Sequence, residues 1–140
     1  MRSVWNRTGV VVAAMLGLAA VPAIAQEMIP KNVRVVVAAA DPADARVVGT
    51  LDNPGMYPSY LIGASTDAAE RVELRDARKK DAKVAEVEIP AYGALSLEAR
   101  GLHLRLINPK KPLRVGTKID LQLENEAHVK TRVSVTVAAR

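Results

Sequence analysis

The segment Ile89–Asn125, IPAYGALSLEARGLHLRLINPKKPLRVGTKIDLQLEN, determines most of what the sequence says about the fold. Apolar residues alternate with polar ones in three runs, at residues 95–97, 102–106 and 119–123. A period of two is typical of strands with one face in a core and the other toward solvent. The prolines, glycines and asparagine between the runs favour turns. The segment therefore predicts three consecutive short strands.

The same alternation continues on both sides of this segment. We expect further strands at residues 32–39, 46–51, 60–64, 69–74, 83–89 and 129–137. In the first of these, the alternation places Val35 in the core and Val36 on the opposite face. Eight or nine short strands separated by turns predict an all-β fold. We expect an antiparallel Greek-key sandwich or barrel of the cupredoxin-like or immunoglobulin-like kind.

The stretch of residues 66–83 also suits a helix, because it is rich in alanine, glutamate, arginine and lysine and because Ser65 or Thr66 is a suitable N-cap. Its apolar residues lack helical spacing, however, whereas Val72 and Leu74 alternate. We therefore expect a turn, a strand and a charged hairpin loop instead of a helix.

The first 25 residues have the composition of a secretory signal peptide. Arg2 and Arg7 precede an uncharged apolar run at residues 9–21, and the small residues of AIA occupy positions 23–25. The run is too short for a membrane-spanning helix. We expect cleavage before Gln26, export to the periplasm without stable insertion in the membrane, and a single domain over residues 26–140. Loss of the two arginines lowers the formal charge from +5 to +3.

The composition excludes several functional classes. The chain has no cysteine, so neither a disulfide nor a thiolate ligand is available. It is only mildly basic and lacks the lysine, arginine and aromatic clusters of nucleic-acid binders. With two histidines, no nucleophile motif and no glycine-rich phosphate loop, the sequence does not predict an enzyme.

The order of the motifs resembles the PCu(A)C family of periplasmic copper chaperones. The resemblance rests on IPAYG at 89–93, GLHL at 101–104 and KKPLRVGT at 110–117. Upstream, LIGAS at 61–65 and RVEL at 71–74 look like the family's GAS turn and VEL strand. The resemblance covers about residues 47–137. It implies a role in handling Cu(I), with delivery to the copper-centre subunit of a respiratory oxidase or to another periplasmic protein.

The resemblance also implies a ligand set, which in the family consists of two histidines and two methionines. Imidazole and thioether groups suit Cu(I), and a two-residue spacing on a strand places both side chains on one face. In this sequence the four positions hold Arg75, approximately Asp81, His103 and Arg105. Only His103 retains a family ligand, and the two arginines disfavour a cation by electrostatic repulsion.

Each of these positions has two interpretations. His103 is either a remaining copper ligand or a half-exposed histidine on the polar side of a strand. Arg75 and Arg105 either bind an anion or an acidic partner, or form an ion-pair cluster with Asp81 at the position of the family's metal site. The first interpretations predict a binding site, whereas the second predict a structural one.

A rebuilt copper site would require other soft donors to reach His103. The donors outside the expected signal peptide are Met28 in a short, mobile leader of residues 26–31, Met56 in a loop, and His128 before the last strand. The sequence does not specify whether any of them converges on His103. It therefore leaves two hypotheses, a copper chaperone-like protein and a metal-free binding module that recognises an anionic or acidic partner.

Overall fold

The computed structural model describes residues 28–38 and 43–140 of the chain. The expected signal peptide lies outside the described residues, so the domain boundary at Gln26 stays a prediction. Among the described residues, no helix has the length and apolar character that a membrane span requires.

The described residues form ten strands and one short 3-10 turn, η1 (Ala77–Lys79). The strands are β1 (Ile29–Val37), β2 (Ala45–Asp52), β3 (Ser59–Thr66), β4 (Ala69–Asp76), β5 (Ala82–Lys83), β6 (Val87–Ile89), β7 (Ala94–Leu97), β8 (Leu102–Pro109), β9 (Lys118–Asn125) and β10 (Lys130–Ala139). The predicted all-β fold is confirmed. The single strand expected at residues 83–89 is instead divided into β5 and β6, and residues 66–83 form β4 and η1 in place of the alternative helix.

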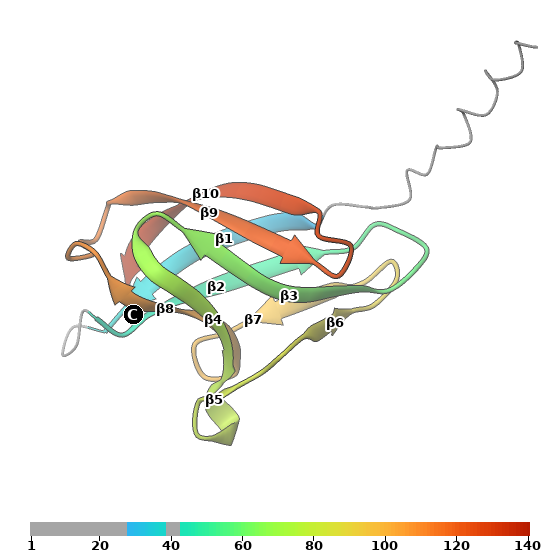
Figure 1. Cartoon of the computed structure of the whole chain (residues 1–140), viewed down its shortest axis with the longest axis horizontal. Coiled ribbons are helices and arrows are strands. Elements are labelled where there is room, and N and C mark those ends of the chain that lie inside the picture. The colour runs from blue at the N-terminus through green and yellow to red at the C-terminus, as the bar shows by residue number, and fades with distance from the viewer. Residues whose placement is uncertain (1–27, 39–42) are drawn as a thin grey trace, which may run out of the picture.

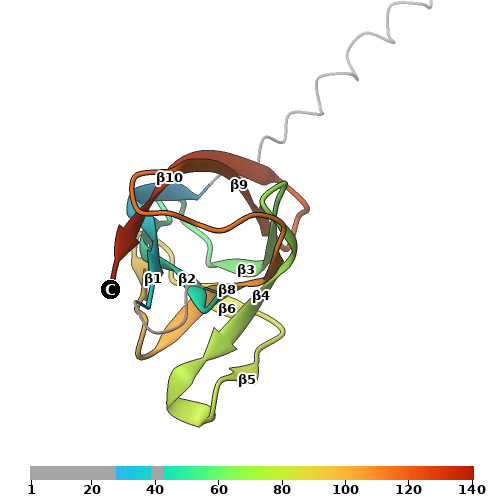
Figure 2. The ribbon, with the colours of Figure 1, turned by 90° about the vertical axis from the view of Figure 1, so that its left-hand side faces the viewer.

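Seven of the strands close into a barrel (Figure 1). Their order around the ring is β4, β8, β2, β1, β10, β9 and β3, and the pairing of Ala64 with Val72 joins β3 to β4. The short strands β5, β6 and β7 pair with β4, β3 and β2 respectively. Every pairing is antiparallel except that of β1 with β10, which is parallel. Figure 2 shows the strands arranged as a ring.

Aliphatic side chains fill the barrel. The buried hydrophobic residues of the described chain include no aromatic residue, and Leu61, Leu104 and Leu121 are among those with no exposed surface. Val36, which we expected on the outer face, is only 6% exposed. The leader prediction is wrong at Met28, because this side chain packs in the core and is 2% exposed.

A glycine in β2 lets β1 approach closely. The register of β1 against β2 shifts between Lys31 and Arg34. Gly49 faces this irregularity with φ +143°, and a Cβ atom there would lie 2.6 Å from Cα of Val33. Only glycine fits, because it combines this backbone conformation with the absence of a side chain.

Candidate functional site

The outward-facing side chains of β4, β8 and β2 form the candidate site. Alternation along the strands turns Glu73 and Arg75 of β4 away from the core, as it does His103 and Arg105 of β8. The register places Arg75 opposite His103 and Glu73 opposite Arg105, while Arg46 of β2 lies on the other side of Arg105. The three residues singled out from the sequence therefore share one surface of the barrel.

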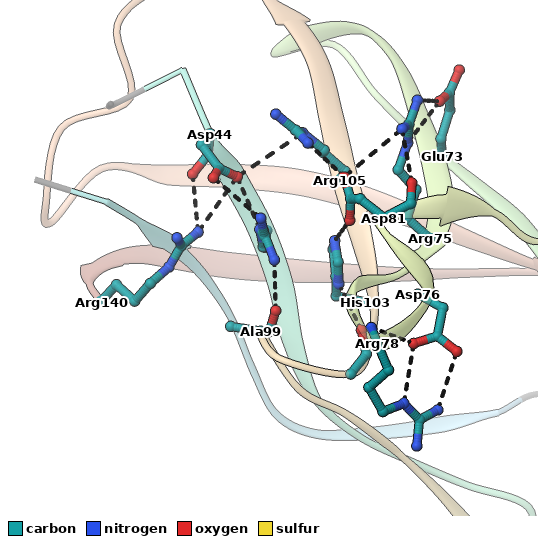
Figure 3. A network of polar contacts seen from close by, with 12 residues as sticks. Asp44, Glu73, Arg75, Asp76, Arg78, Asp81, Ala99, His103, Arg105 and Arg140 are labelled. Atoms are coloured by element: carbon teal, nitrogen blue, oxygen red, sulfur yellow. Dashed lines mark hydrogen bonds and ion pairs between the residues drawn. The ribbon is translucent and has the colours of Figure 1, made fainter. Parts of the chain in front are cut away.

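Asp81 reaches this surface from the connection between β4 and β5. The connection bends through η1 and then through Lys80 and Asp81, both with φ 58°. The carboxylate of Asp81 lies 2.5 Å from Nη1 of Arg105 and 3.8 Å from Nη1 of Arg75. It also lies 3.1 Å from Nε2 of His103. The structure thus contains the Arg75–Asp81–Arg105 ion-pair cluster, with His103 against the same carboxylate (Figure 3).

Glu73 extends the cluster along β4. Its carboxylate lies 2.7 Å from Nε of Arg71 and 2.5 Å from Nη2 of Arg75. Hydrogen bonds from Arg71 and Arg75, with the charges of both, lower the pKa of Glu73 from 4.5 to about 2 against the opposing effect of burial. Glu73 is therefore ionised at neutral pH, and Arg75 lies between two carboxylates.

Asp44 extends the cluster in the other direction. It accepts hydrogen bonds of 2.9 and 3.2 Å from Arg46, and it lies 3.5 Å from Arg140 and 3.9 Å from Arg105. Burial acts to raise the pKa of Asp44, but hydrogen bonds from Arg46 and Arg140 and the nearby positive charges together lower it below its usual value. Arg105, like Arg75, therefore has two carboxylate neighbours.

His103 is completely buried, so the half-exposed position that we expected is wrong. The connection between β4 and β5 folds over it, and the N–H of Ala77 donates to the carbonyl of Gly101 at 3.0 Å. The same carbonyl lies 2.9 Å from Nδ1 of His103. Because a carbonyl only accepts, this contact assigns the ring proton to Nδ1.

The other ring nitrogen of His103 has no hydrogen-bond partner of suitable geometry. Nε2 of His103 and Oδ1 of Asp81 are both buried and unsatisfied, although they lie only 3.1 Å apart. Burial lowers the pKa of His103, helped by the charges of Arg46 and Arg105 and opposed by Gly101 and Asp81. Burial therefore favours the neutral form of this ring.

This set of donors does not fit Cu(I). The groups around Nε2 of His103 are a carboxylate oxygen and guanidinium groups, whereas Cu(I) prefers imidazole and thioether ligands. Over residues 28–38 and 43–140, no group of three or more histidine, aspartate or glutamate side chains is arranged to hold a metal ion. Arg75, Asp81 and Arg105 are ion-paired with one another instead.

The other soft donors do not complete a site with His103. Met28 lies in the core, and His128 has its Nδ1 2.7 Å from Glu124 in the turn between β9 and β10. Met56 is 62% exposed on the loop after β2. That loop begins six residues beyond Val47, the partner of Leu104 beside His103. Six strand residues span roughly 20 Å, so Met56 is remote from His103.

A shallow cavity of about 360 Å³ opens beside the cluster. It is lined by Arg75 and Arg105, with Ala43, Leu106, Ile107, Asn108 and Pro109 around them. A guanidinium group carries five N–H donors in a fixed plane, which matches the geometry of carboxylate and phosphate groups. Two guanidinium groups, and no metal ligand, therefore line this cavity among the described residues.

Several residues of the site were not recognised in the sequence. Glu73 was detectable in principle, because a spacing of two places it on the same strand face as Arg75. Asp44 and Arg46 carry no comparable pattern, since only the pairing of β2 with β8 brings them to Arg105.

Solved structures with the same fold define the class of protein. The apo PCuAC domain from PmoF1 has a TM-score of 0.72 and 18% identity, covering 82% of this chain and 96% of that domain. The copper-bound PCuAC domain from PmoF2 has a TM-score of 0.70 and 17% identity, and the match covers 82% of this chain and 95% of that domain. The Cu(I) form of DR1885 from Deinococcus radiodurans has a TM-score of 0.64 and 31% identity, and the match covers 86% of this chain and 85% of that protein. The chain therefore has the fold of the PCuAC copper chaperones.

Residues 29–137 match the LpqE-like family, and the chain belongs to it. This match and the similarity to DR1885 confirm the resemblance to the PCu(A)C family. Comparison with curated protein sequences gives no match.

Proposed function

We propose that the protein is an exported binding module of the PCuAC type that recognises an anionic group through Arg75 and Arg105 and does not depend on copper. One observation carries the proposal. Arg75, Asp81 and Arg105 are joined by ion pairs beside an open cavity. The family resemblance assigns these residues, approximately for Asp81, to three of the four ligand positions, so guanidinium groups stand where metal ligands would be expected.

The charges of the cluster favour an anion. Four carboxylates, those of Asp44, Glu70, Glu73 and Asp81, face five arginines, Arg46, Arg71, Arg75, Arg105 and Arg140. One positive charge is therefore in excess. The carboxylates also hold the guanidinium groups in place, so less side-chain entropy is lost when a ligand binds.

The location outside the cytoplasm is part of the proposal. It is supported by the composition of residues 1–25 and by the description of the LpqE-like family as lipoproteins. Recovery of the protein in the periplasmic fraction, with an amino terminus at Gln26, is the result expected from fractionation and amino-terminal sequencing.

A second function, the handling of Cu(I) as cargo, is favoured by a different observation. DR1885, which is 31% identical to this chain, was solved with Cu(I), and Nε2 of His103 lacks a hydrogen-bond partner here. For Cu(I) to bind, Asp81 must move away from Nε2 and a partner protein must supply soft donors. In that case the protein takes part in copper delivery to a respiratory oxidase, as the family resemblance implies.

Two titrations of the same protein separate these functions. In the first, calorimetry with inorganic phosphate compares the wild type with the double variant Arg75→Gln/Arg105→Gln and with Arg114→Ala, an exposed arginine outside the cluster. We expect at least tenfold weaker binding in the double variant and no change in the control. Equal binding in all three proteins would refute the anion site.

The second titration uses a chromogenic Cu(I) chelator with the wild type and His103→Ala. We expect both proteins to leave the chelator fully loaded. Retention of one equivalent of Cu(I) by the wild type, lost in His103→Ala, would instead establish copper handling at His103. Circular dichroism of each variant in the far ultraviolet checks that its fold is intact.

A further inference from the structure

One end of the barrel carries most of the exposed large apolar side chains. Four of the five such side chains in the described residues lie there, and the fifth, Val115, lies on the connection between β8 and β9. The four are Ile29, Met56, Tyr57 and Tyr92, with exposures of 44%, 62%, 71% and 72%. We call these four residues the tyrosine surface. None of the tyrosines in the described part of the chain lies in the core, and two of them are exposed at this end of the barrel.

Two loops and the start of β1 bring these side chains together. The N–H of Tyr92 donates to the carbonyl of Gly55 at 3.0 Å, which joins the loop after β6 to the loop after β2. Ile29 pairs with Asp52 at the end of β2, next to the same loops. Figure 1 shows both loops at one end of the barrel, away from the carboxyl terminus. The four residues therefore lie on neighbouring segments at this end of the barrel.

A buried asparagine fixes the loops. Asn53 is 3% exposed, and its Nδ2 donates to the carbonyls of Tyr57 at 2.8 Å and Ile89 at 3.0 Å. Its Oδ1 accepts from the N–H of Gly55 at 2.9 Å, and its own N–H donates to Gly93 at 2.8 Å. Apolar side chains on a fixed backbone lose little conformational entropy when a partner covers them.

Carboxylates border the tyrosine surface. Glu88 lies opposite Tyr60 in the pairing of β6 with β3, and Glu126 accepts the N–H of Tyr60 at 2.9 Å on the other side. Both are exposed. The nearby Lys31 is bound to Asp52 at 2.5 Å. The border is therefore negatively charged.

We propose that the tyrosine surface docks a basic, apolar segment of a partner protein, in which lysine or arginine alternates with aliphatic residues. Tyrosine rings attract lysine and arginine side chains through cation–π interactions, and they also offer area to aliphatic ones. The carboxylates of Glu88 and Glu126 complement the positive charges of such a segment.

Area and charge both argue against a second copy of this chain as the occupant. Two tyrosines, a methionine and an isoleucine exposed to this extent present on the order of 500 Å², the size of the largest apolar patch on many monomers. A stable protein complex usually buries about 800 Å² on each side. A symmetric contact would also bring the glutamates of one copy against those of the other, which is repulsive.

The docking surface is distinct from the arginine cluster. Arg46 lies at the beginning of β2 and pairs with Arg105 of β8, whereas Asp52, at the other end of β2, leads into the tyrosine surface. Loss of anion binding at Arg75 and Arg105 therefore leaves docking intact.

The test uses the full chain and two synthetic nonapeptides, one of alternating lysine and leucine and the other of alternating glutamate and leucine. Isothermal titration measures both with the wild type, with Tyr57→Ser/Tyr92→Ser and with Val115→Ser. The Val115 variant removes an equally exposed apolar side chain elsewhere. We expect the lysine peptide to bind the wild type and Val115→Ser alike, and the double tyrosine variant at least tenfold more weakly.

Equal binding of the two peptides, or equal binding by the double tyrosine variant, would overturn the proposal. So would sedimentation showing a dimer of the wild type that the double variant no longer forms, because a second copy would then be the occupant. The tyrosines are exposed, so their replacement leaves the core unchanged. Raising the salt concentration should weaken binding of the lysine peptide to the wild type.

Discussion

Replacing Glu73 by glutamine should lower the free energy of unfolding at pH 7 by about 1–2 kcal/mol. Glu73 is the carboxylate that Arg71 and Arg75 bind from both sides. Glutamine keeps the size of the side chain but removes the charge. The change therefore isolates the electrostatic contribution of this part of the cluster from its packing.

The magnitude follows from the pKa of Glu73, which is about 2 in the folded protein against an ordinary 4.5. A difference of that size would be worth about 3 kcal/mol if the full effect were realised. Arg71 is 55% exposed and Arg75 is 27% exposed, so water screens both interactions. We therefore reduce the expected contribution to about half.

The pH dependence has a defined sign. Because the pKa of Glu73 is lower in the folded state, its contribution to stability is fully present above pH 4.5 and is lost as the pH falls toward 2. Urea unfolding at pH 7, 5, 3 and 2, followed by far-ultraviolet circular dichroism, measures this. The difference between the wild type and Glu73→Gln should be largest at pH 7 and should approach zero at pH 2.

The matched control is Glu70→Gln. Glu70 also lies beside Arg71, at 3.0 Å, but its side chain is 59% exposed. This variant should change the unfolding free energy by less than about 0.5 kcal/mol. A difference between wild type and Glu73→Gln that stays constant from pH 7 to pH 2 would refute the reasoning, because the loss would then come from packing.

Three further substitutions test the barrel by urea unfolding. Gly49→Ala should cost about 2 kcal/mol or more because its Cβ would meet Val33, whereas Gly63→Ala, with no atom within 4 Å, should stay within about 0.5 kcal/mol; equal effects would contradict this account of β1. Leu104→Ala should lower the free energy of unfolding by about 3–5 kcal/mol, since the side chain is fully buried. A loss below about 1 kcal/mol would show that neighbouring side chains fill the cavity. Asn53→Ala should cost about 2–3 kcal/mol by leaving carbonyls unsatisfied, and an unchanged stability would mean that water replaces the amide.

Much of the fold could be predicted because apolar and polar residues alternate along each half-buried strand, and this alternation is visible in the sequence. Leu104, Leu106 and their neighbours lie in the core as the pattern indicates. The division of residues 83–89 was not predictable in this way, because it arises when the chain leaves β4 and pairs with β3. A pattern along one strand does not specify where the strand changes partner.

Some members of the candidate site were predictable, but their environment was not. The spacing of two placed His103 and Arg105 on one strand face, and the family resemblance added Arg75. The burial of His103 was missed because it depends on the chain that folds over it. That connection passes through Lys80 and Asp81, both at positive φ. This conformation is usually occupied by glycine or asparagine, so a lysine gives no sign of it in the sequence.

The exposed tyrosines have a spectroscopic consequence. Tyrosine absorbs in the near ultraviolet and reports its local environment there, while the strands dominate the far ultraviolet. Tyr57 and Tyr92 are already in water in the folded protein, so unfolding should change their near-ultraviolet dichroism little, whereas a partner that covers them should change it strongly. Folding and recognition would then be followed in one sample through two separate optical bands.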